Sequence, residues 1–344
     1  MLILTNHDVS NILLNLSSEQ VRQLLNSLGK TLSLYSKEQL SNEPKCLHQP
    51  HRSNIVTKHN DTTLVMPSSD TTNTGVKIVT LPHNGSATGA NLVIEPTGAV
   101  VGMLNAAEVT AFRTALTIMT LFARVTHIHK KNIICFGSGR QVEWHIRLAL
   151  LLAPTEVQNI VILNRGQSRL DQLEKDAIAS LRTRYPQVDF RLVSREATPD
   201  FDALVQLNLS LADVVFCCTP STEPLFPFRD LASSPKPRFI SAIGSYKPHM
   251  QEIDTETLLS GGKIFVDSKD ACLQESGELI TANVKPDQLA EIGEFLASDG
   301  SPGIPSTGNI VFKCVGMGIM DLVISRGLLD IADEAAIGQT VARF

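Results

Sequence analysis

The 344-residue chain lacks the features of three large classes of protein. It has no dense block of lysine and arginine and its formal net charge is −5, so nucleic acid is not an expected partner. Its six cysteines include no C-x-x-C pair, so we expect core thiols in a reducing compartment and no metal. The richest apolar run, residues 148–153, is too short to span a bilayer. Since no basic segment precedes a long apolar stretch, we expect no secretory signal, no membrane association and a cytoplasmic location.

Two patterns of apolar residues divide the chain. Hydrophobic residues make up 43% of it, and its length predicts two domains with packed cores. Residues 55–101 show period-two strands, interrupted by turn residues at 60–61, 67–75, 84–85 and 96–98, which predicts antiparallel hairpins. From residue 132 onward strands and helices alternate, which predicts a doubly wound parallel sheet. The predicted fold class is therefore α/β, with a Rossmann-type parallel sheet and a second α+β domain.

The same periods predict the individual elements. A strand at 2–4 precedes one amphipathic helix, whose buried face has six candidate residues: Leu13, Leu14, Leu16, Val21, Leu24 and Leu25. Further helices are expected at 110–124, 141–152 and 169–184, and the apolar tail at 308–333 has helical spacing. The parallel strands are expected at 133–136, 159–163, 189–193, 214–218, 239–243 and 263–266.

A glycine-rich turn, GSGRQVEWH, follows the first of these parallel strands. Glycines at such a turn let the backbone approach a pyrophosphate, and the amides of the following helix N-terminus hold its charge. The third glycine of G-x-G-x-x-G is replaced by Val142, at a position that mainly sets helix–strand packing. The turn predicts a dinucleotide site, and an ordinary strand-to-helix turn is the alternative. The candidate cofactor residues of this turn are Gly137, Ser138, Gly139, Arg140 and Gln141.

The end of the second parallel strand bears on which nicotinamide cofactor would bind. A carboxylate about 20 residues past the glycines usually binds the ribose hydroxyls of NAD. Here the strand ends in Asn164 and Arg165, with no acid to repel a 2′-phosphate. Arg165 can pair with that phosphate, and Ser168 and Arg169 can assist. We therefore favour NADP(H), with NAD(H) as the alternative, although a solvated loop arginine would look the same in the sequence.

Eight segments spread over most of the chain carry a resemblance to a known family. They are TGVKIVT, EPTGAVVGMLNAAEVTAFRTA, GSGRQVEWH, VILNR, ADVVFCCTPSTEPLF, FISAIGSYKPHMQEID, KIFVDSKDACLQESGELI and VFKCVGMGIMDL. In their order and spacing the sequence resembles the ornithine cyclodeaminase/mu-crystallin family of nicotinamide proteins. The resemblance implies a Rossmann domain at 124–307, and a substrate-binding and dimerisation domain built from 1–123 plus 308–344. It also matches Thr219, Pro220, Ile243 and Gly244 to turns that line the cofactor.

Three cations in the first domain are candidates for substrate binding. Lys77 stands inside a strand-like run, Arg113 on a helix of small and apolar residues, and Arg52 before a strand. Taken singly, each fits a solvated charge or a structural ion pair. The resemblance implies instead that all three clamp the carboxylate of the substrate. Two guanidinium groups and one ammonium would fix an amino-acid-like carboxylate and select against neutral ligands.

One loop departs from the family pattern. Ornithine cyclodeaminases have an aspartate in this loop that handles the substrate amine, and alignment on Pro248 and Glu252 places Tyr246 there. Without that base, internal cyclisation of an activated amine is disfavoured. Tyr246 and Lys247 are candidates to orient an imine, although such loop residues are usually solvated. The resemblance thus favours the ketimine reductase and pyrroline-2-carboxylate reductase branch.

The resulting hypothesis is reduction of a cyclic ketimine carboxylate by NAD(P)H. The candidate substrates are 1-pyrroline-2-carboxylate and 1-piperideine-2-carboxylate, giving L-proline and L-pipecolate. An ornithine cyclodeaminase and an alanine-type amino-acid dehydrogenase remain alternatives within the family. A protein of mu-crystallin type that binds NADPH with a small ligand is the alternative of another class. A homodimer is expected from the resemblance alone.

Overall fold

The computed structural model describes residues 1–83, 85–298 and 303–342. The chain forms two compact units, Met1–Thr117 with Gly316–Phe344, and Ile118–Val315. These limits differ from the expected 123/124 and 307/308. Helix α3 (Ala106–Phe122) crosses the first limit, and strand β14 (Ile310–Lys313) belongs to the sheet of the second unit. The second limit therefore falls after β14.

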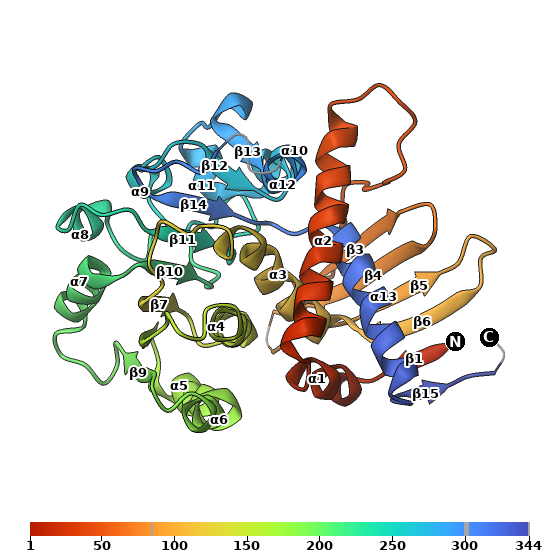
Figure 1. Cartoon of the computed structure of the whole chain (residues 1–344), viewed down its shortest axis with the longest axis horizontal. Coiled ribbons are helices and arrows are strands. Elements are labelled where there is room, and N and C mark those ends of the chain that lie inside the picture. Colours follow the sequence, from red (N-terminus) through yellow and green to blue (C-terminus); the bar gives the residue numbers. More distant parts are fainter. Residues whose placement is uncertain (84, 299–302, 343–344) are drawn as a thin grey trace. The chain divides into compact units, whose positions relative to one another are not determined.

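The first unit contains a seven-stranded sheet of order β15-β1-β6-β5-β4-β3-β2 (Figure 1). Neighbours from β2 to β6 pair antiparallel as the hairpin pattern predicted, and β1 lies parallel to β6. The turn expected at 67–75 is shorter than predicted, because Pro67 pairs with Val76 inside the sheet and the chain reverses at 70–73. Residue 84 of the expected 84–85 turn lies outside the described residues. The strands are β1 (Leu2–Leu4), β2 (Ser53–Val56), β3 (Thr62–Ser69), β4 (Thr74–Leu81), β5 (Thr88–Ile94), β6 (Val100–Asn105) and β15 (Gln339–Thr340).

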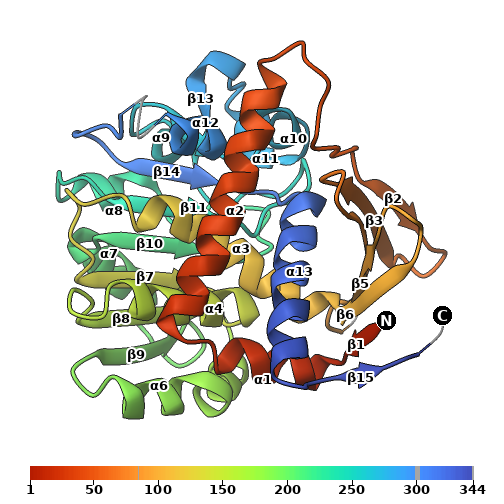
Figure 2. The ribbon, with the colours of Figure 1, turned by 45° about the vertical axis from the view of Figure 1, so that its right-hand side comes forward.

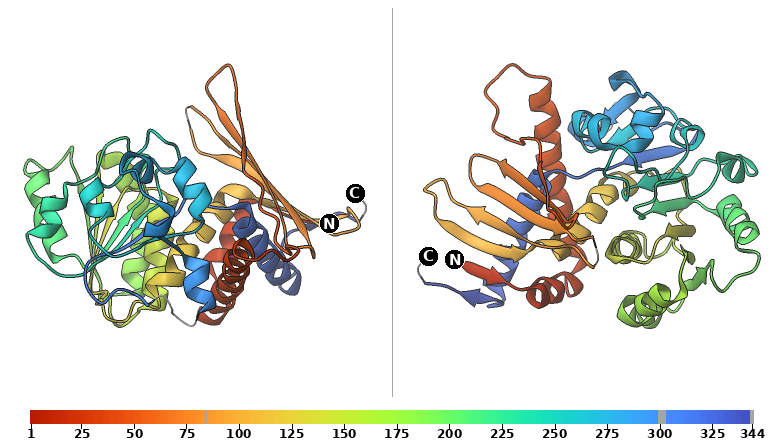
Figure 3. Two further views of the ribbon diagram at one scale, coloured as in Figure 1. Left: turned by 90° about the horizontal axis from the view of Figure 1, so that it is seen from above. Right: turned by 180° about the vertical axis from the view of Figure 1, so that it is seen from behind.

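The single helix expected near the start of the chain is two helices, α1 (Asn6–Leu14) and α2 (Ser18–Gln39). Thr5 and Ser17 each cap a helix with the side-chain oxygen, so the chain restarts instead of continuing. Leu14, expected on the buried face, is 40% exposed at that break. Helix α13 (Gly318–Glu334) packs against β3, β4 and β5, so helices cover one face of this sheet (Figure 3).

The second unit contains the predicted parallel sheet, of order β13-β12-β14-β11-β10-β7-β8-β9 (Figure 2). The tail expected to be helical from 308 begins with β14, which lies between β11 and β12, and its helix starts only at Gly318. All four residues of β14 are buried, and a short run of this kind has no period in the sequence that distinguishes a strand from a helical turn. The other strands are β7 (Asn132–Phe136), β8 (Asn159–Asn164), β9 (Asp189–Ser194), β10 (Val214–Cys217), β11 (Phe239–Ala242), β12 (Ile264–Val266) and β13 (Leu289–Glu291).

Helices connect these strands and bury the sheet. The helix predicted at 169–184 is α5 (Gln167–Leu173), a π-helical turn (Glu174–Ile178) and α6 (Ala179–Arg184). The remaining helices are α4 (Arg140–Leu152), α7 (Phe201–Leu211), α8 (Phe228–Ala232), α9 (Thr255–Leu258), α10 (Lys269–Glu275), α11 (Gly277–Thr281), a 3₁₀ turn (Pro286–Gln288) and α12 (Ile292–Ala297). Within the described ranges, no helix is long and apolar enough to cross a membrane.

Candidate functional site

A cavity of about 610 Å³ opens at the carboxyl ends of β7, β8 and β10 in the second unit. This is the edge of a doubly wound sheet where ligands bind. Its walls come from three strand-end turns that are far apart in the sequence. The predicted cofactor residues that line it are Gly137, Ser138, Gly139, Asn164, Arg165, Thr219 and Pro220. The cavity is therefore the candidate dinucleotide site.

The geometry of the first turn requires glycine at one of its two glycine positions. Gly137 has φ +112°, and a Cβ there would lie 2.9 Å from the carbonyl oxygen of Cys218. Gly139 precedes α4 with extended backbone, and a Cβ there would meet no atom within 4 Å, so the protein's own packing does not require glycine at this position. Val142, in place of the third glycine, is fully buried in α4. The missing glycine therefore affects the packing of the helix and not the backbone of the glycine-rich turn.

A third arginine, which the sequence did not single out, lines the cavity beside Arg165 and Arg169: Arg195. Its guanidinium makes two hydrogen bonds to Asp202, of 2.6 and 3.2 Å, and lies 4.6 Å from the centroid of the Phe201 ring. These contacts hold the side chain in place. The pairing of β8 with β9 brings Arg195 to this cavity, because the Arg195 amide donates to the Asn164 carbonyl at the end of β8.

The structure also places an acid, Glu196, near the turn after β8. The end of that strand in the sequence does not contain this residue, so the sequence did not identify it. The Glu196 carboxylate accepts a hydrogen bond of 2.9 Å from the Gln167 amide at the start of α5. The Glu196 amide donates to the Arg165 carbonyl. The strand end itself carries no acid, as the sequence indicates, but Glu196 lies beside the turn that follows it. Arg165, Arg169 and Arg195 line the cavity, and so does a second glutamate, Glu223.

The remaining predicted cofactor residues lie around the cavity, not among the described residues that line it. Arg140 pairs with Glu143 of the same helix, and the Gln141 carbonyl contacts the His145 ring at 2.7 Å. Ser168 is exposed on α5. Ile243 and Gly244 follow β11. A Cβ on Gly244 would stand 2.0 Å from the Thr219 carbonyl oxygen, so this turn packs directly on the lining turn.

The histidine of the glycine-turn helix has a structural environment. His145 is fully buried and its ring centroid lies 4.9 Å from that of Phe216. Burial lowers the pKa of His145 to about 4, although the hydrogen bond to Gln141 opposes the shift. The ring is therefore neutral at physiological pH and is not available as an imidazolium acid.

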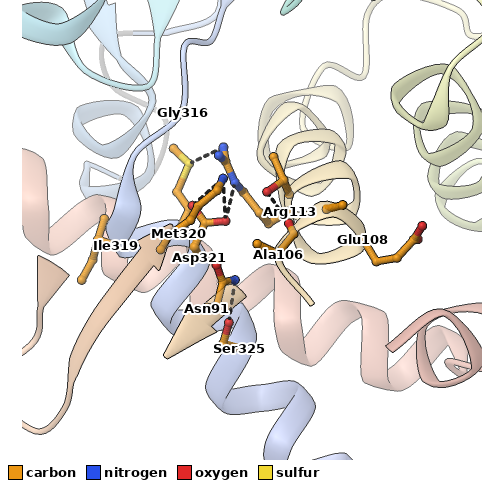
Figure 4. A network of polar contacts seen from close by, with 12 residues as sticks. Asn91, Ala106, Glu108, Arg113, Gly316, Ile319, Met320, Asp321 and Ser325 are labelled. Atoms are coloured by element: carbon orange, nitrogen blue, oxygen red, sulfur yellow. Dashed lines mark hydrogen bonds and ion pairs between the residues drawn. The ribbon is translucent and has the colours of Figure 1, made fainter. Parts of the chain in front are cut away.

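In the first unit, two of the three predicted cations, Lys77 and Arg113, contact a carboxylate that the sequence did not identify, Asp321 of α13. Figure 4 shows Arg113 beside Asp321. The Lys77 ammonium of β4 lies 3.3 and 3.4 Å from the two Asp321 oxygens. The Arg113 Nε of α3 lies 3.2 Å from Oδ1 of the same carboxylate. All three side chains are buried. The interpretation of Lys77 as a solvated charge is thereby excluded.

Arg52, the third predicted cation, joins this cluster through the backbone. Its Nη2 donates a hydrogen bond of 2.7 Å to the Gly316 carbonyl. Gly316 has φ +87°, and a Cβ there would lie 2.5 Å from Nη1 of Arg113. Glycine at this position is therefore required both by the backbone conformation and by the space that the Arg113 guanidinium occupies.

The protonation of Lys77 reflects its buried position. Desolvation lowers its pKa to about 8, the attraction of Asp321 opposes that shift, and the charges of Arg113 and Arg52 add to it. Lys77 and Arg113 thus share the single negative charge of Asp321. A ligand carboxylate beside these two cations would supply a second negative charge.

Tyr246 lies in the second unit, in the turn after β11. Partial burial raises the pKa of its phenol, so it is neutral at physiological pH. The Lys247 ammonium lies 5.7 Å from the centroid of the Tyr246 ring. The phenol can donate or accept a hydrogen bond, and its contribution to an imine site stays a prediction.

The sequence matches known proteins along nearly its whole length. The model of the ornithine cyclodeaminase/mu-crystallin family matches residues 14–335. An uncharacterized protein of Saccharomyces cerevisiae, YGL159W, is 30% identical and the match covers 96% of each chain. Delta(1)-pyrroline-2-carboxylate reductase of Bacillus cereus is 24% identical over 82% of this chain and 85% of its own. Ketimine reductase mu-crystallin of Mus musculus is 26% identical over 82% and 84%.

The fold matches solved structures equally fully. Delta(1)-pyrroline-2-carboxylate reductase of Thermococcus litoralis, in complex with NADH and L-proline, superposes with a TM-score of 0.82. It is 20% identical, and the match covers 99% of this chain and all of the other. An archaeal alanine dehydrogenase dimer with bound NAD superposes with a TM-score of 0.77 at 16% identity, over 100% and 99% of the two chains. At these identities the likeness establishes the fold.

Proposed function

The chain belongs to the ornithine cyclodeaminase/mu-crystallin family, and we propose that it reduces a cyclic ketimine carboxylate with NAD(P)H. The observation that carries the proposal is the buried pair of cations Lys77 and Arg113, which share one carboxylate, Asp321. Arg52 adds a third positive charge near Lys77. A site with this excess of positive charge fits an anion, and a planar carboxylate matches the guanidinium groups. The glycine-turn cavity of the second unit fits the pyrophosphate of a dinucleotide.

The chemistry needs few groups from the protein. The substrate carboxylate is held by the cations of the first unit, and its ring nitrogen carries a proton as an iminium. A reduced nicotinamide bound at the glycine-turn cavity would supply the hydride for the iminium carbon, and the product would be the secondary amine of L-proline or L-pipecolate. A protonated imine is already electrophilic, so no strong general acid is required. Positioning and charge then account for the protein's part of catalysis.

The departure at Tyr246 supports reduction over cyclodeamination. A phenol whose pKa is raised is a poor base at neutral pH, so it does not replace the aspartate of ornithine cyclodeaminases. The names of the Bacillus and mouse relatives, a pyrroline-2-carboxylate reductase and a ketimine reductase, point the same way. We therefore propose 1-pyrroline-2-carboxylate and 1-piperideine-2-carboxylate as substrates.

The loss of reduced-nicotinamide absorbance tests the proposal directly. Each imine is added to the protein with NADPH and with NADH in separate reactions. In parallel, L-alanine with NAD⁺ is assayed by the appearance of NADH, and L-ornithine with NAD⁺ by the release of ammonia, because cyclodeamination causes no net change in the cofactor. We expect turnover with at least one imine and none with ornithine or alanine. Absence of imine turnover with clear NADPH binding would contradict the reductase. Activity on ornithine or alanine would instead identify one of the two family alternatives.

For the cofactor we propose NADP(H) over NAD(H), supported by Arg165, Arg169 and Arg195 in one cavity. In an Arg165→Ala variant we expect the Kd of NADPH to rise about tenfold, because a charge-assisted contact with the 2′-phosphate is lost. The Kd of NADH should change less than about twofold. Titration of the intrinsic fluorescence of each reduced cofactor measures both. Equal weakening for the two cofactors would contradict a 2′-phosphate contact.

The lowered pKa of Lys77 predicts a pH dependence of substrate affinity. Below about pH 8 the ammonium is protonated and attracts the carboxylate, and above it the charge is lost, so KM for the imine should rise with pH. An arginine keeps its charge throughout this range. In Lys77→Arg the rise in KM that is due to this residue should therefore disappear, while the titration of the imine itself remains common to both proteins. Identical KM profiles for the two proteins would contradict the assignment.

We also propose a homodimer that uses the sheet face opposite α13. A row of apolar residues crosses five strands on that face, and none of the five is fully buried: Ile3, Pro67, Val76, Leu92 and Met103. In Figure 3 this face carries no helix of the first unit. Such a partly exposed apolar face is typical of a protein interface. Light scattering of the purified protein should give twice the mass of 37.4 kDa, and a monomer mass would contradict the proposal.

A further inference from the structure

Three strand-end turns at the cofactor cavity touch one another through their backbones. Gly137 approaches Cys218, and a Cβ on Gly244 would lie 2.0, 2.4 and 2.5 Å from three backbone atoms of Thr219. The turns after β7, β10 and β11 therefore form one stack. Thr219, at the centre of it, lines the cavity. A displacement of the Gly244 turn would move Thr219 and change the wall that contacts the dinucleotide.

A single buried carboxylate joins two of these turns. One oxygen of Glu252 accepts hydrogen bonds from the amide (2.6 Å) and the hydroxyl (3.1 Å) of Thr219. The other oxygen accepts from the Gly244 amide at 2.6 Å. Glu252 is 0% exposed. Both of its oxygens are thus used to hold the ends of neighbouring strands, and neither is available to solvent.

The charged and titratable groups around Glu252 come from four elements. Glu278 of α11 accepts the Glu252 amide at 2.8 Å, and Lys313 of β14 lies 3.5 Å from Glu278. At the end of β10, Cys217 and Cys218 are thiols whose pKa burial raises, and the neutral His145 of α4 lies 3.9 Å from the Cys218 sulfur. Lys313 also donates to the Ser245 carbonyl at 2.7 Å and is therefore a structural charge.

The two glutamates differ in their protonation. Burial favours the neutral form of Glu278, yet Lys313 and the Ser245 hydroxyl hold its pKa below the ordinary value. For Glu252 burial is the dominant influence, and it raises the pKa to about 7, against the attraction of Lys313 and the Thr219 and Gly244 amides. Glu278 is thus ionised at neutral pH, while Glu252 changes its charge there.

We propose that the ionised carboxylate of Glu252 is a positioning residue, which holds the Thr219 and Gly244 turns in the arrangement that binds the dinucleotide. This inference rests on the proposed function, because it assumes that the cavity takes a nicotinamide dinucleotide. A protonated carboxyl has one oxygen occupied by its own proton, so it cannot accept from all three donors. Protonation should therefore loosen the turns and weaken dinucleotide binding below about pH 7.

The free energy of unfolding should also depend on the protonation of Glu252, but in the direction opposite to that of dinucleotide affinity. Because the pKa of Glu252 is higher in the folded than in the unfolded chain, its ionisation lowers the free energy of unfolding as the pH rises toward 7. Dinucleotide affinity should increase over that range. A residue that merely supported the fold would make affinity and stability rise and fall together, so this opposition is specific to a positioning role.

Calorimetry of NAD⁺ binding to the whole protein tests the inference. NAD⁺ has no phosphate monoester, so the ligand itself does not titrate near pH 7. In buffers of different ionisation enthalpy at pH 7, binding should release up to about 0.5 proton, because the bound form favours the ionised carboxylate. In Glu252→Gln the release should vanish and the Kd should rise about tenfold. Glu256→Gln, an exposed residue of α9, is the matched control and should behave like the wild type.

The outcomes separate this inference from the proposed function. Wild-type binding without proton release and with a flat Kd between pH 6 and 8 would overturn the inference alone, and this result does not require the variant to fold. A folded Glu252→Gln variant that keeps both the affinity and the proton release would do the same. Failure of the wild type to bind NAD⁺, NADH or NADPH would overturn both.

Discussion

An Arg113→Ala variant is expected to lose kcat/KM for the imine by about a hundredfold to a thousandfold, which corresponds to about 3 to 4 kcal/mol. The guanidinium is buried beside Asp321, and its removal takes away a planar two-point contact for the substrate carboxylate. It also leaves Asp321 with Lys77 as its remaining partner in the described cluster, which makes the site less positive. The Kd of NADPH should stay within about twofold, because the dinucleotide cavity is lined by residues of the other unit.

The matched control is Arg326→Ala, which removes another Arg–Asp pair of the same unit. Arg326 of α13 contacts Asp70 at 2.5 Å, and its side chain is 38% exposed. Its loss should leave kcat/KM nearly unchanged, because an exposed ion pair contributes little. Steady-state kinetics and a thermal melt of each variant decide the matter. An Arg113→Ala protein that melts like the wild type and keeps full kcat/KM would exclude Arg113 from substrate binding.

The sequence predicts one part of the cofactor site well, because that part is local. The strand, the two glycines and the start of the helix follow one another directly along residues 132–145, which include GSGRQVEWH. Their spacing alone therefore identifies the turn. Arg195 and Glu196 could not be found in this way. They reach the end of β8 only through the register of β9, which pairs Ser194 with Asn164 and brings the next residue, Arg195, to the Asn164 carbonyl. A linear search for an acid about 20 residues past the glycines does not include this neighbour.

The cation cluster shows the same limit at longer range. The three cations are identified through resemblance, yet the partner that Lys77 and Arg113 share lies 244 residues from Lys77. Asp321 follows an apolar stretch and stands in a helix whose pattern shows only burial, so nothing local marks it as a counter-ion. Glu252 is similar: in the sequence it served as an alignment marker, and only the stacking of the Thr219 and Gly244 turns gives it a role. The fold determines which residues form a buried ion pair. The sequence can therefore draw attention to one charged residue without showing which residue pairs with it.

An Asp321→Asn variant has the second large expected effect. The amide keeps the shape of the side chain but removes the negative charge that Lys77 and Arg113 share. Buried cations without a counter-ion are costly, and breaking such a pair lowers the free energy of unfolding by about 3–5 kcal/mol. Asp321 is also the main influence that keeps the Lys77 pKa from falling below about 8, so in the variant this pKa should fall further. Asp330→Asn, an exposed residue of the same helix, should change the stability by less than about 0.5 kcal/mol.

The response of this variant to ligand distinguishes a substrate site from a structural ion pair. If the cluster binds a carboxylate, L-proline restores a negative charge at the position where Asp321 lost one. The melting temperature of Asp321→Asn should then rise more with L-proline than that of the wild type, because ligand binding to the folded state is stronger there. Prolinamide, which has no carboxylate, should give no such gain. An equal rise for both proteins, or an equal effect of prolinamide, would mean that Lys77, Arg113 and Asp321 hold the fold together without contacting the substrate.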